Sequence, residues 1–156
     1  GHVPLGAHTG RVSAKELKLI GIKGTLLNHS ERKIPLKYLV EIIANCKKEK
    51  LRTIVCASSL GEVKRIAAMK PNYIAYEPKE LIGGNVSVTE ANPDVIVKAV
   101  DMVRSISKKT KVLCGAGVHN KEDVGHSLML GCAGVLIGHA VPKAKDPIKF
   151  LQEMLL

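Results

Sequence analysis

Residues 53–76 read TIVCASSLGEVKRIAAMKPNYIAY, and this stretch determines the predicted fold of the chain. It begins with a short β-branched run and ends with a second apolar run over Tyr73–Tyr76. Between the two runs, Ser59 and Glu62 have the spacing of a helix capping box ahead of an apolar helical stripe. A strand, a helix and a strand in this order predict a crossover unit with two parallel strands.

The same alternation continues on both sides of this stretch. Further strands are predicted at 24–28, 111–114 and 135–137, and each is followed by a helical pattern. One more helix, with a capping box formed by Ser13 and Glu16, precedes the first strand. Five strand–helix units of this size fit five-eighths of an eight-unit barrel, which has roughly 31 residues per unit. A complete five-stranded doubly wound sheet is the alternative.

The faces of the predicted helices follow from the 3.6-residue period. The helix after the first strand has an apolar stripe that we expect in the core: Leu36, Leu39, Val40, Ile43 and Ala44. The helix after the third strand, capped by Asn92, has another: Ile96, Ala99, Val100 and Val103. Asn120 and Asp146 are predicted to cap the next two helices, since both side chains accept backbone hydrogen bonds at helix starts.

The composition is that of an ordinary folded domain. The 156 residues are 46% hydrophobic and 24% charged, which excludes disorder of the whole chain. No apolar stretch reaches the ~18 residues of a membrane-spanning helix. The net charge of +10 would attract nucleic acid, acidic membranes or a phosphorylated metabolite. Because aromatic residues are few and the lysines are scattered, we expect a solvated basic surface, with neither nucleic acid nor a membrane as partner.

The cysteines and histidines favour an intracellular protein without a metal. None of the four cysteines has a CxxC partner, which is typical of free thiols in a reducing compartment, and a cytoplasmic location is expected. The six histidines show no HExxH motif and no cysteine–histidine array. We therefore expect no metal.

Candidate functional residues come at the ends of the predicted strands, because the loops there carry the sites of parallel sheets. His29 follows the first strand, and Glu77 leaves the third. Partial desolvation there would make Glu77 a stronger base. The segment 78–88, with Gly83 and Gly84, is predicted to form a lid whose backbone N–H groups close on an anion. Taken singly, a turn histidine and a strand-end glutamate also have ordinary structural explanations.

Two loops rich in small residues follow the fourth and fifth predicted strands. Residues 114–123 read CGAGVHNKED, and residues 137–147 read IGHAVPKAKDP. Small residues at neighbouring strand ends let main-chain N–H groups approach a phosphate, and a helix start adds a favourable dipole. The two loops together predict a phosphate site.

Five stretches resemble the triosephosphate isomerase family, in particular its short archaeal type. They are GAHTG at 6–10, GTLLNHSER at 24–32, AYEPKELIGG at 75–84, VLCGAGV at 112–118 and GVLIGHAVPKAKDP at 134–147. They occur in the family's order and cover nearly the whole chain. The resemblance implies an α/β fold in which 1–156 is a single partial (β/α)8 TIM-barrel domain, truncated at its N-terminus, with strands four to eight of the barrel. The Asn-x-Lys of the first strand, whose lysine binds substrate in this family, has no counterpart here.

The resemblance also implies roles for particular residues. It makes His29 the catalytic electrophile and Glu77 the catalytic base. It assigns supporting roles to Asn28 and Glu31. It implies that the substrate phosphate is bound by Ile82, Gly83, Gly117, Gly138 and His139. The lid departs from the family pattern at 83–85, and His139 stands where a small residue is usual.

The implied activity is the interconversion of dihydroxyacetone phosphate and D-glyceraldehyde 3-phosphate through an enediolate, in glycolysis and gluconeogenesis. The resemblance implies a triose phosphate as the small-molecule partner and no cofactor. It also implies a homo-oligomer, dimer or tetramer, assembled through the loop around Thr9. One alternative is a non-catalytic truncated fragment or assembly partner that keeps the phosphate loops. Another phosphate-binding barrel enzyme would explain those loops but neither LNHSER nor AYEP.

Overall fold

A computed structural model describes residues 3, 6–78 and 93–155 of the chain. The strands are β1 (Gly24–Leu27), β2 (Arg52–Ala57), β3 (Tyr73–Tyr76) and β4 (Lys111–Cys114). The helices are α1 (Ala14–Leu19), α2 (Leu36–Lys48), α3 (Leu60–Ala68), α5 (Pro93–Ile106), α6 (Lys121–Met129), α7 (Ala140–Lys143) and α8 (Pro147–Glu153), with a 3-10 turn, η1, at Ser30–Arg32.

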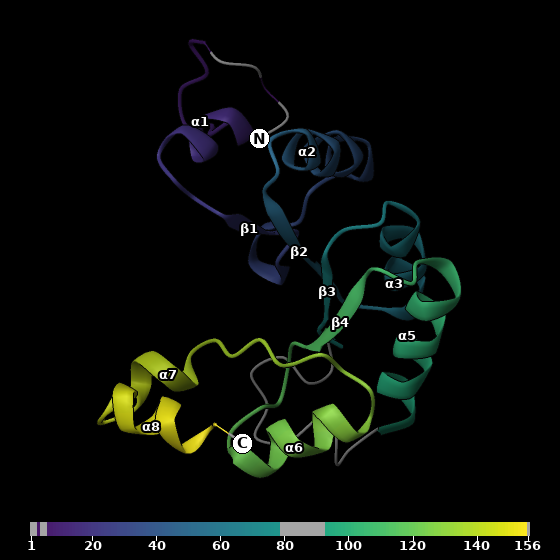
Figure 1. Cartoon of the computed structure of the whole chain (residues 1–156), viewed down its shortest axis with the longest axis vertical. Coiled ribbons are helices and arrows are strands. Elements are labelled where there is room, and N and C mark those ends of the chain that lie inside the picture. Colours follow the sequence, from purple (N-terminus) through teal and green to yellow (C-terminus); the bar gives the residue numbers. More distant parts are fainter. Residues whose placement is uncertain (1–2, 4–5, 79–92, 156) are drawn as a thin grey trace.

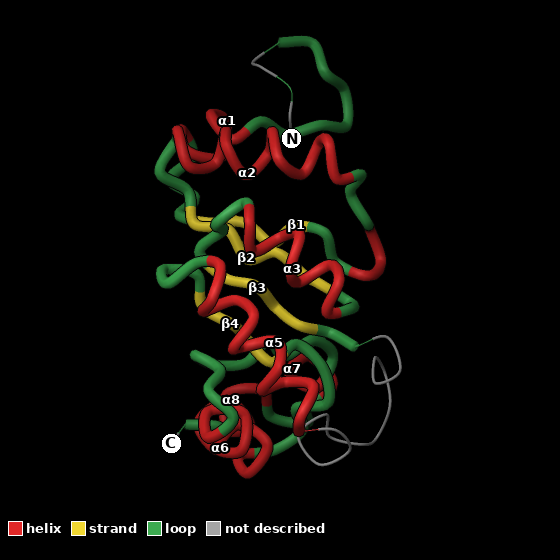
Figure 2. Tube along the Cα trace, turned by 90° about the vertical axis from the view of Figure 1, so that its right-hand side faces the viewer, coloured by secondary structure: helices red, strands yellow, loops and turns green. Residues whose placement is uncertain are grey.

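The four strands form one parallel sheet in the order β1-β2-β3-β4. Figure 2 shows the strands side by side, with α1 and α2 at one end of the molecule and α6 to α8 at the other. The predicted α/β class and parallel sheet are confirmed. The predicted bounds of β3 and β4 agree with the observed ones.

The fifth predicted strand, 135–137, is not part of this sheet. Val135 makes a single parallel bridge to Cys114, and the Leu136 N–H donates to the Cys114 carbonyl at 2.8 Å. β2 and β3 each have a strand on both sides, whereas this segment is paired only with β4 in the described structure. The prediction of a fifth sheet strand is therefore not confirmed, since one bridge is too little pairing to define a strand. The next helix, α7, was not predicted.

The main core lies between one face of the sheet and the helices α2, α3 and α5, which Figure 1 shows along that face. The residues predicted for the α5 face are all buried, which confirms that stripe. Among the described residues, the opposite face carries a small buried cluster, Cys56, Ala75 and Leu113. The described helices α2, α3 and α5 therefore cover one face of the sheet.

The predicted face of α2 is partly wrong. Leu39 and Ile43 are buried as expected, but Leu36 and Val40 are 46% and 48% exposed, and Ala44 is exposed as well. Ile42 and Cys46 are buried instead, in a second cluster with Ala14 of α1 and Leu51. Because α1 docks beside α2, the buried stripe is rotated toward α1.

The capping predictions hold, with one exception. Ser13 and Glu16 form the full box, with the Glu16 N–H donating to Ser13 Oγ at 3.1 Å. Asn120 and Asp146 cap α6 and α8. Ser59 caps α3, but the Glu62 carboxylate turns to Ser58 rather than closing a box. Asn92 lies outside the described residues.

All four cysteines are free and buried, in agreement with the expected thiols. Within the described residues, no helix is long and apolar enough to cross a membrane.

The corrected α2 face predicts unequal effects for two neighbouring truncations. Ile42→Ala should destabilise the fold by about 2–4 kcal/mol, because it leaves a cavity between α1 and α2. Val40→Ala should change the free energy of unfolding by less than about 0.5 kcal/mol, because the side chain is half-exposed on a helix where alanine is favourable. Urea denaturation of both variants measures the difference. Equal losses of unfolding free energy in the two variants would contradict the corrected buried face of α2.

Candidate active site

The register of the sheet aligns the residues that follow each strand. Ala57 of β2 pairs with Tyr76 of β3, and Tyr76 pairs with Cys114 of β4. Beyond the strands, the Glu77 N–H donates to the Ala57 carbonyl at 2.7 Å, and the Gly115 N–H donates to the Tyr76 carbonyl at 2.9 Å. Backbone hydrogen bonds therefore fix Glu77 at the carboxyl end of β3, between the ends of β2 and β4.

Asn28 fixes the turn that carries His29. Its backbone has φ 59°, a left-handed conformation that asparagine tolerates better than most residues. The buried Asn28 amide donates from Nδ2 to the Cys56 carbonyl at 2.9 Å and accepts the Ile34 N–H at 2.9 Å. The side chain thus ties both ends of the turn to the carboxyl end of β2.

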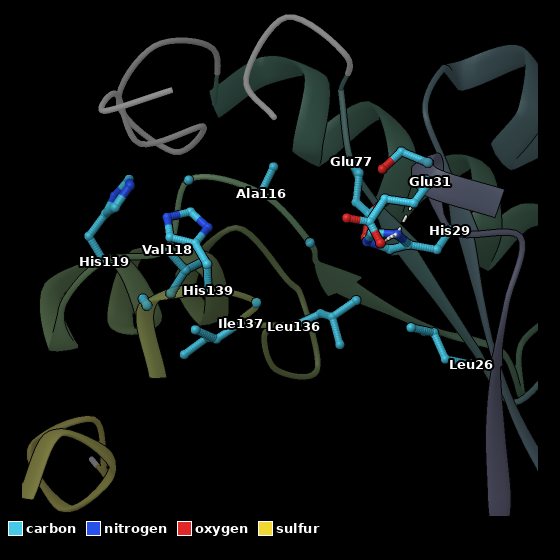
Figure 3. A pocket seen from close by; sticks show the side chains of 15 residues that line it. Leu26, His29, Glu31, Glu77, Ala116, Val118, His119, Leu136, Ile137 and His139 are labelled. Atoms are coloured by element: carbon cyan, nitrogen blue, oxygen red, sulfur yellow. Dashed lines mark hydrogen bonds and ion pairs between the residues drawn. The ribbon is translucent and has the colours of Figure 1, made fainter. Parts of the chain in front are cut away.

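His29 faces Glu77 through its outer ring nitrogen. The Glu31 N–H donates to His29 Nδ1 at 3.4 Å, so the proton of the neutral ring is assigned to Nε2. His29 Nε2 lies 3.9 Å from Glu77 Oε1 (Figure 3). Glu31 Oε2 also lies 3.7 Å from Nδ1, but the Glu31 side chain is 88% exposed, so this pair contributes little.

Burial changes the proton affinity of Glu77. The side chain is only 4% exposed, and this burial raises the pKa of the carboxyl above its ordinary value. A hydrogen bond with the Cys56 thiol and the nearby His29 and Lys33 oppose the effect without cancelling it. Burial and the Glu77 charge also raise the pKa of the Cys56 thiol, so that it stays protonated and donates. A raised pKa of this kind is a property that a general base needs.

Gly115 makes room for Glu77. A Cβ atom at Gly115 would lie 2.6 Å from Glu77 Cγ and 3.1 Å from the Tyr76 carbonyl oxygen. Any other residue at this position would push against the carboxylate or the backbone of β3. Gly115 is therefore required by the close approach of two strand ends.

A polar network supports the turn after η1. Lys33 Nζ lies 3.0 Å from Glu62 Oε2, and the Ser58 N–H donates to the same oxygen at 2.7 Å. Burial alone would raise the pKa of Glu62, but the hydrogen bonds from Ser58 and Lys33 outweigh it and lower that pKa. The network joins the His29 turn to the start of α3.

These elements surround a cavity of about 370 Å³. The predicted site residues that line it are His29, Glu31, Glu77, Gly117, Gly138 and His139. Figure 3 shows the carboxylates and His29 together on one side and His139 on the other. Asn28 is buried and does not line the cavity. Ile82 and Gly83 lie outside the described residues.

Three residues near the site were not singled out from the sequence: Cys56, Gly115 and His119. Gly115 stands in the CGAG motif, and a close approach at a strand end is an ordinary reason for such a glycine. Nothing in the sequence distinguishes Cys56 from the other residues of its predicted strand. His119 lines the cavity and pairs with Asp123, four residues along the chain. In the described part of the chain, no three His, Cys, Asp or Glu side chains form a metal-binding group.

Fold and site together define an α/β protein with an imidazole and a buried carboxylate facing each other at the carboxyl edge of a parallel sheet. A sequence model of the family "Triosephosphate isomerase" matches residues 2–154. The chain belongs to the triosephosphate isomerase family.

Individual relatives agree with this assignment. The triosephosphate isomerase of Methanocaldococcus jannaschii is 45% identical over 150 residues, which are 96% of this chain and 68% of the relative. That of Thermoplasma volcanium is 40% identical over 98% of this chain and 71% of the relative. Among solved structures, the thiamine phosphate pyrophosphorylase of Pyrococcus furiosus has a TM-score of 0.61 and 22% identity, over 90% of this chain and 61% of that one. That likeness concerns the fold alone.

The buried carboxylate predicts a pH-dependent gain in stability on its removal. Above the raised pKa of Glu77, the folded state holds an unfavourable buried charge, so Glu77→Gln should be more stable than the parent at about pH 7. As the pH falls from the raised pKa to below the ordinary value of 4.5, the folded and then the unfolded parent take up the proton, and the gain disappears. Urea denaturation across this range measures it. Glu153→Gln, at a 64% exposed side chain, is the control. A gain independent of pH would contradict the assignment.

The close approach at Gly115 predicts a second stability effect. Gly115→Ala should destabilise the fold by about 1–3 kcal/mol, because the new methyl group meets Glu77 and the β3 carbonyl. Gly125→Ala is the matched control: a Cβ there meets nothing within 4 Å, and alanine should stabilise α6 by up to about 1 kcal/mol. Thermal and urea unfolding compare the two. A neutral Gly115→Ala would show that Glu77 is not confined by this loop.

Proposed function

We propose that the chain interconverts dihydroxyacetone phosphate and D-glyceraldehyde 3-phosphate, with Glu77 as the base and His29 as the electrophile. The observation that carries the proposal is the pair itself: Glu77 Oε1 lies 3.9 Å from His29 Nε2 at the wall of one cavity. Two glycine-containing loops line the same cavity and offer backbone donors to a phosphate. Membership of the triosephosphate isomerase family supports the same reaction.

The proposed chemistry is a proton transfer between neighbouring carbons. The Glu77 carboxylate removes a proton from carbon 1 of dihydroxyacetone phosphate, and the electrons of that C–H bond move toward the carbonyl to give an enediolate. The carboxylic acid so formed returns a proton to carbon 2. The hydroxyl proton on the carbon 1 oxygen passes to the carbon 2 oxygen, which leaves the aldehyde at carbon 1 and the hydroxyl at carbon 2. Because burial raises its pKa, Glu77 is a better base than an exposed glutamate.

His29 acts on the oxygens of the same intermediate. Its Nε2–H donates to the substrate oxygen on which negative charge develops, while the Glu31 N–H holds the ring through Nδ1. Asn28 positions the turn, since its amide bonds both the Cys56 carbonyl and the Ile34 N–H. The exposed Glu31 carboxylate is a minor contributor to ring orientation.

The phosphate is proposed to lie at the end of the cavity formed by the loops after β4 and after Val135. Gly117, with φ 64°, Gly138 and His139 present backbone to this end of the cavity. Ile82 and Gly83 are assigned to the phosphate on the family resemblance. No metal or cofactor takes part in the proposed reaction.

We further propose that the described sheet is part of a TIM barrel, as a single domain over 1–156 in which the segment at Val135 corresponds to a fifth strand. Two observations support this. β1 is an edge strand, and Leu26 on it is 44% exposed. The face of the sheet away from the helices lines an open groove of about 510 Å³ with Leu26, Ile54, Tyr73 and Leu113. An apolar sheet face of this kind needs a cover in water.

The family and the composition also suggest the setting of the protein. A homo-oligomer formed near Thr9 is supported by exposed apolar residues on the helix that follows this loop: Leu19 and Ile20, at the C-terminal end of α1, are 72% and 73% exposed. A cytoplasmic location is supported by the four free, buried cysteines.

The test is an isomerase assay on the chain alone and on the chain mixed with a peptide carrying the first three strands of the Methanocaldococcus jannaschii relative. We expect activity to rise when the peptide is added, because the family's substrate-binding lysine and the cover for β1 both come from that segment. Glu77→Asp should then lower turnover by about 100-fold or more, because the carboxylate retracts by one methylene from the reacting carbon. His29→Gln should lower turnover by a similar factor.

Two results would count against this function. Glu77→Asp and His29→Gln variants within about twofold of the parent would remove both residues from the mechanism, because general acid–base catalysis contributes at least about 100-fold. A mixture that binds the peptide but does not isomerise either triose phosphate would leave the chain as a non-catalytic assembly partner. Full family-like turnover by the chain alone would show that the proposed barrel needs no added strands.

A further inference from the structure

His119 and His139 share the phosphate end of the cavity. His119 comes from the loop after β4, and His139 directly precedes α7. Both line the same cavity as Glu77. Figure 3 shows both rings on the side away from the cluster of His29, Glu31 and Glu77.

The side chains that line the cavity include few groups that are able to attract an anion. Among the described residues that line it, the acidic side chains are Glu31 and Glu77, and neither lysine nor arginine is present. The basic groups there are the three imidazoles of His29, His119 and His139. Among the described residues that line the cavity, His119 and His139 are therefore the side chains at this end that are able to carry a positive charge.

His119 is held in place by a buried carboxylate. Asp123 Oδ2 lies 3.5 Å from His119 Nδ1 and accepts the His119 N–H at 2.7 Å. The Asp123 side chain is 6% exposed, and its own N–H donates to the cap Asn120 at 2.8 Å. The carboxylate thus holds the backbone of His119 by a hydrogen bond and lies close to Nδ1 of its ring.

We propose that His119 and His139 are phosphate-binding side chains, and that their protonation makes anion binding at this end of the cavity dependent on pH. The proposal rests on the proposed function for the identity of the natural ligand, a phosphate ester. Imidazole changes its charge between about pH 5 and 8, so two such groups act as cations for a dianion at the lower end of this range.

Other titratable groups lie next to the two rings or line the same cavity. Asp123 of α6 contacts His119, and Glu31, His29 and Glu77 line the far part of the cavity. Lys143 is on the same short helix as His139, and its N–H donates to the His139 carbonyl. Protonation of His29 or Glu77 would also favour an anion, so the test must separate these two from His119 and His139.

Sulfate is the probe, because it stays a dianion over the whole pH range and imitates the phosphate group. We would titrate the full chain with sulfate at about pH 5.5 and about pH 8, at constant ionic strength, and follow the backbone amides of Gly117 and Gly138 by NMR. The parent should bind sulfate about fivefold more weakly at the higher pH, because two partly exposed charged hydrogen bonds are lost. The double variant His119→Gln with His139→Gln should show less than a twofold change.

Control variants make the test specific. His126→Gln removes an exposed imidazole from α6 that does not line the cavity, and it should keep the parent's pH dependence. His29→Gln should also keep most of that dependence if the charge comes from the phosphate end. His139→Gln alone changes an exposed side chain, and it should reduce the dependence even if the double variant fails to fold.

The readout does not depend on turnover. Sulfate that binds with the expected pH dependence to a chain with no isomerase activity would support the two histidines and reject the catalytic proposal. An unchanged pH dependence in the His139→Gln and double variants would overturn the inference. So would a parent whose Gly117 and Gly138 amides do not respond to sulfate at either pH.

Discussion

The parallel register from β1 to β4 is the constraint on which the site depends. Leu27 pairs with Val55, and Ala57 pairs with Tyr76, so the residues that follow β1, β2 and β3 reach one edge together. A slip of one residue in β3 would turn Glu77 to the opposite face of the sheet, because successive side chains alternate. The 3.9 Å between Glu77 and His29 therefore follows from backbone pairing, with the Asn28 amide as a side-chain clamp.

The buried carboxylate of Glu77 at this edge lowers the stability of the fold. Glu77 is almost fully buried, and the groups that oppose its desolvation are a thiol, a half-exposed imidazole and a lysine already paired with Glu62. None of them is a close ion pair with the carboxylate, so its pKa stays raised. A carboxylate stabilised by a close lysine or arginine would favour folding more but would be a weaker base. The incomplete compensation around Glu77 suits proton transfer better than stability.

Local signals made the strands, the caps and the site positions predictable, and tertiary contacts decided the rest. β3 and β4 follow their apolar runs, and Asn120 and Asp146 cap helices because capping depends on the residue and its next few neighbours. The buried face of α2 depends on where α1 docks, and this cannot be predicted from the hydrophobic periodicity of α2 alone. Glu62 does not close the expected capping box, because its carboxylate bonds Ser58 and Lys33 instead. Cys56 became a partner of Glu77 only through the pairing of β2 with β3.

The open edge strand and the turn that carries His29 are consecutive parts of the chain. β1 ends at Leu27, and Asn28 and His29 follow at once. Any strand that pairs in parallel with the free side of β1 brings its carboxyl end next to this turn, beside the exposed Glu31 carboxylate. Under the proposed barrel, β1 is the fourth strand, so the third strand would take this place. The family's substrate-binding lysine is on the first strand, which would follow the eighth around the closed barrel. Pairing at β1 would therefore not by itself bring that positive charge to the reacting end. The phosphate end, by contrast, has its two imidazoles already in place.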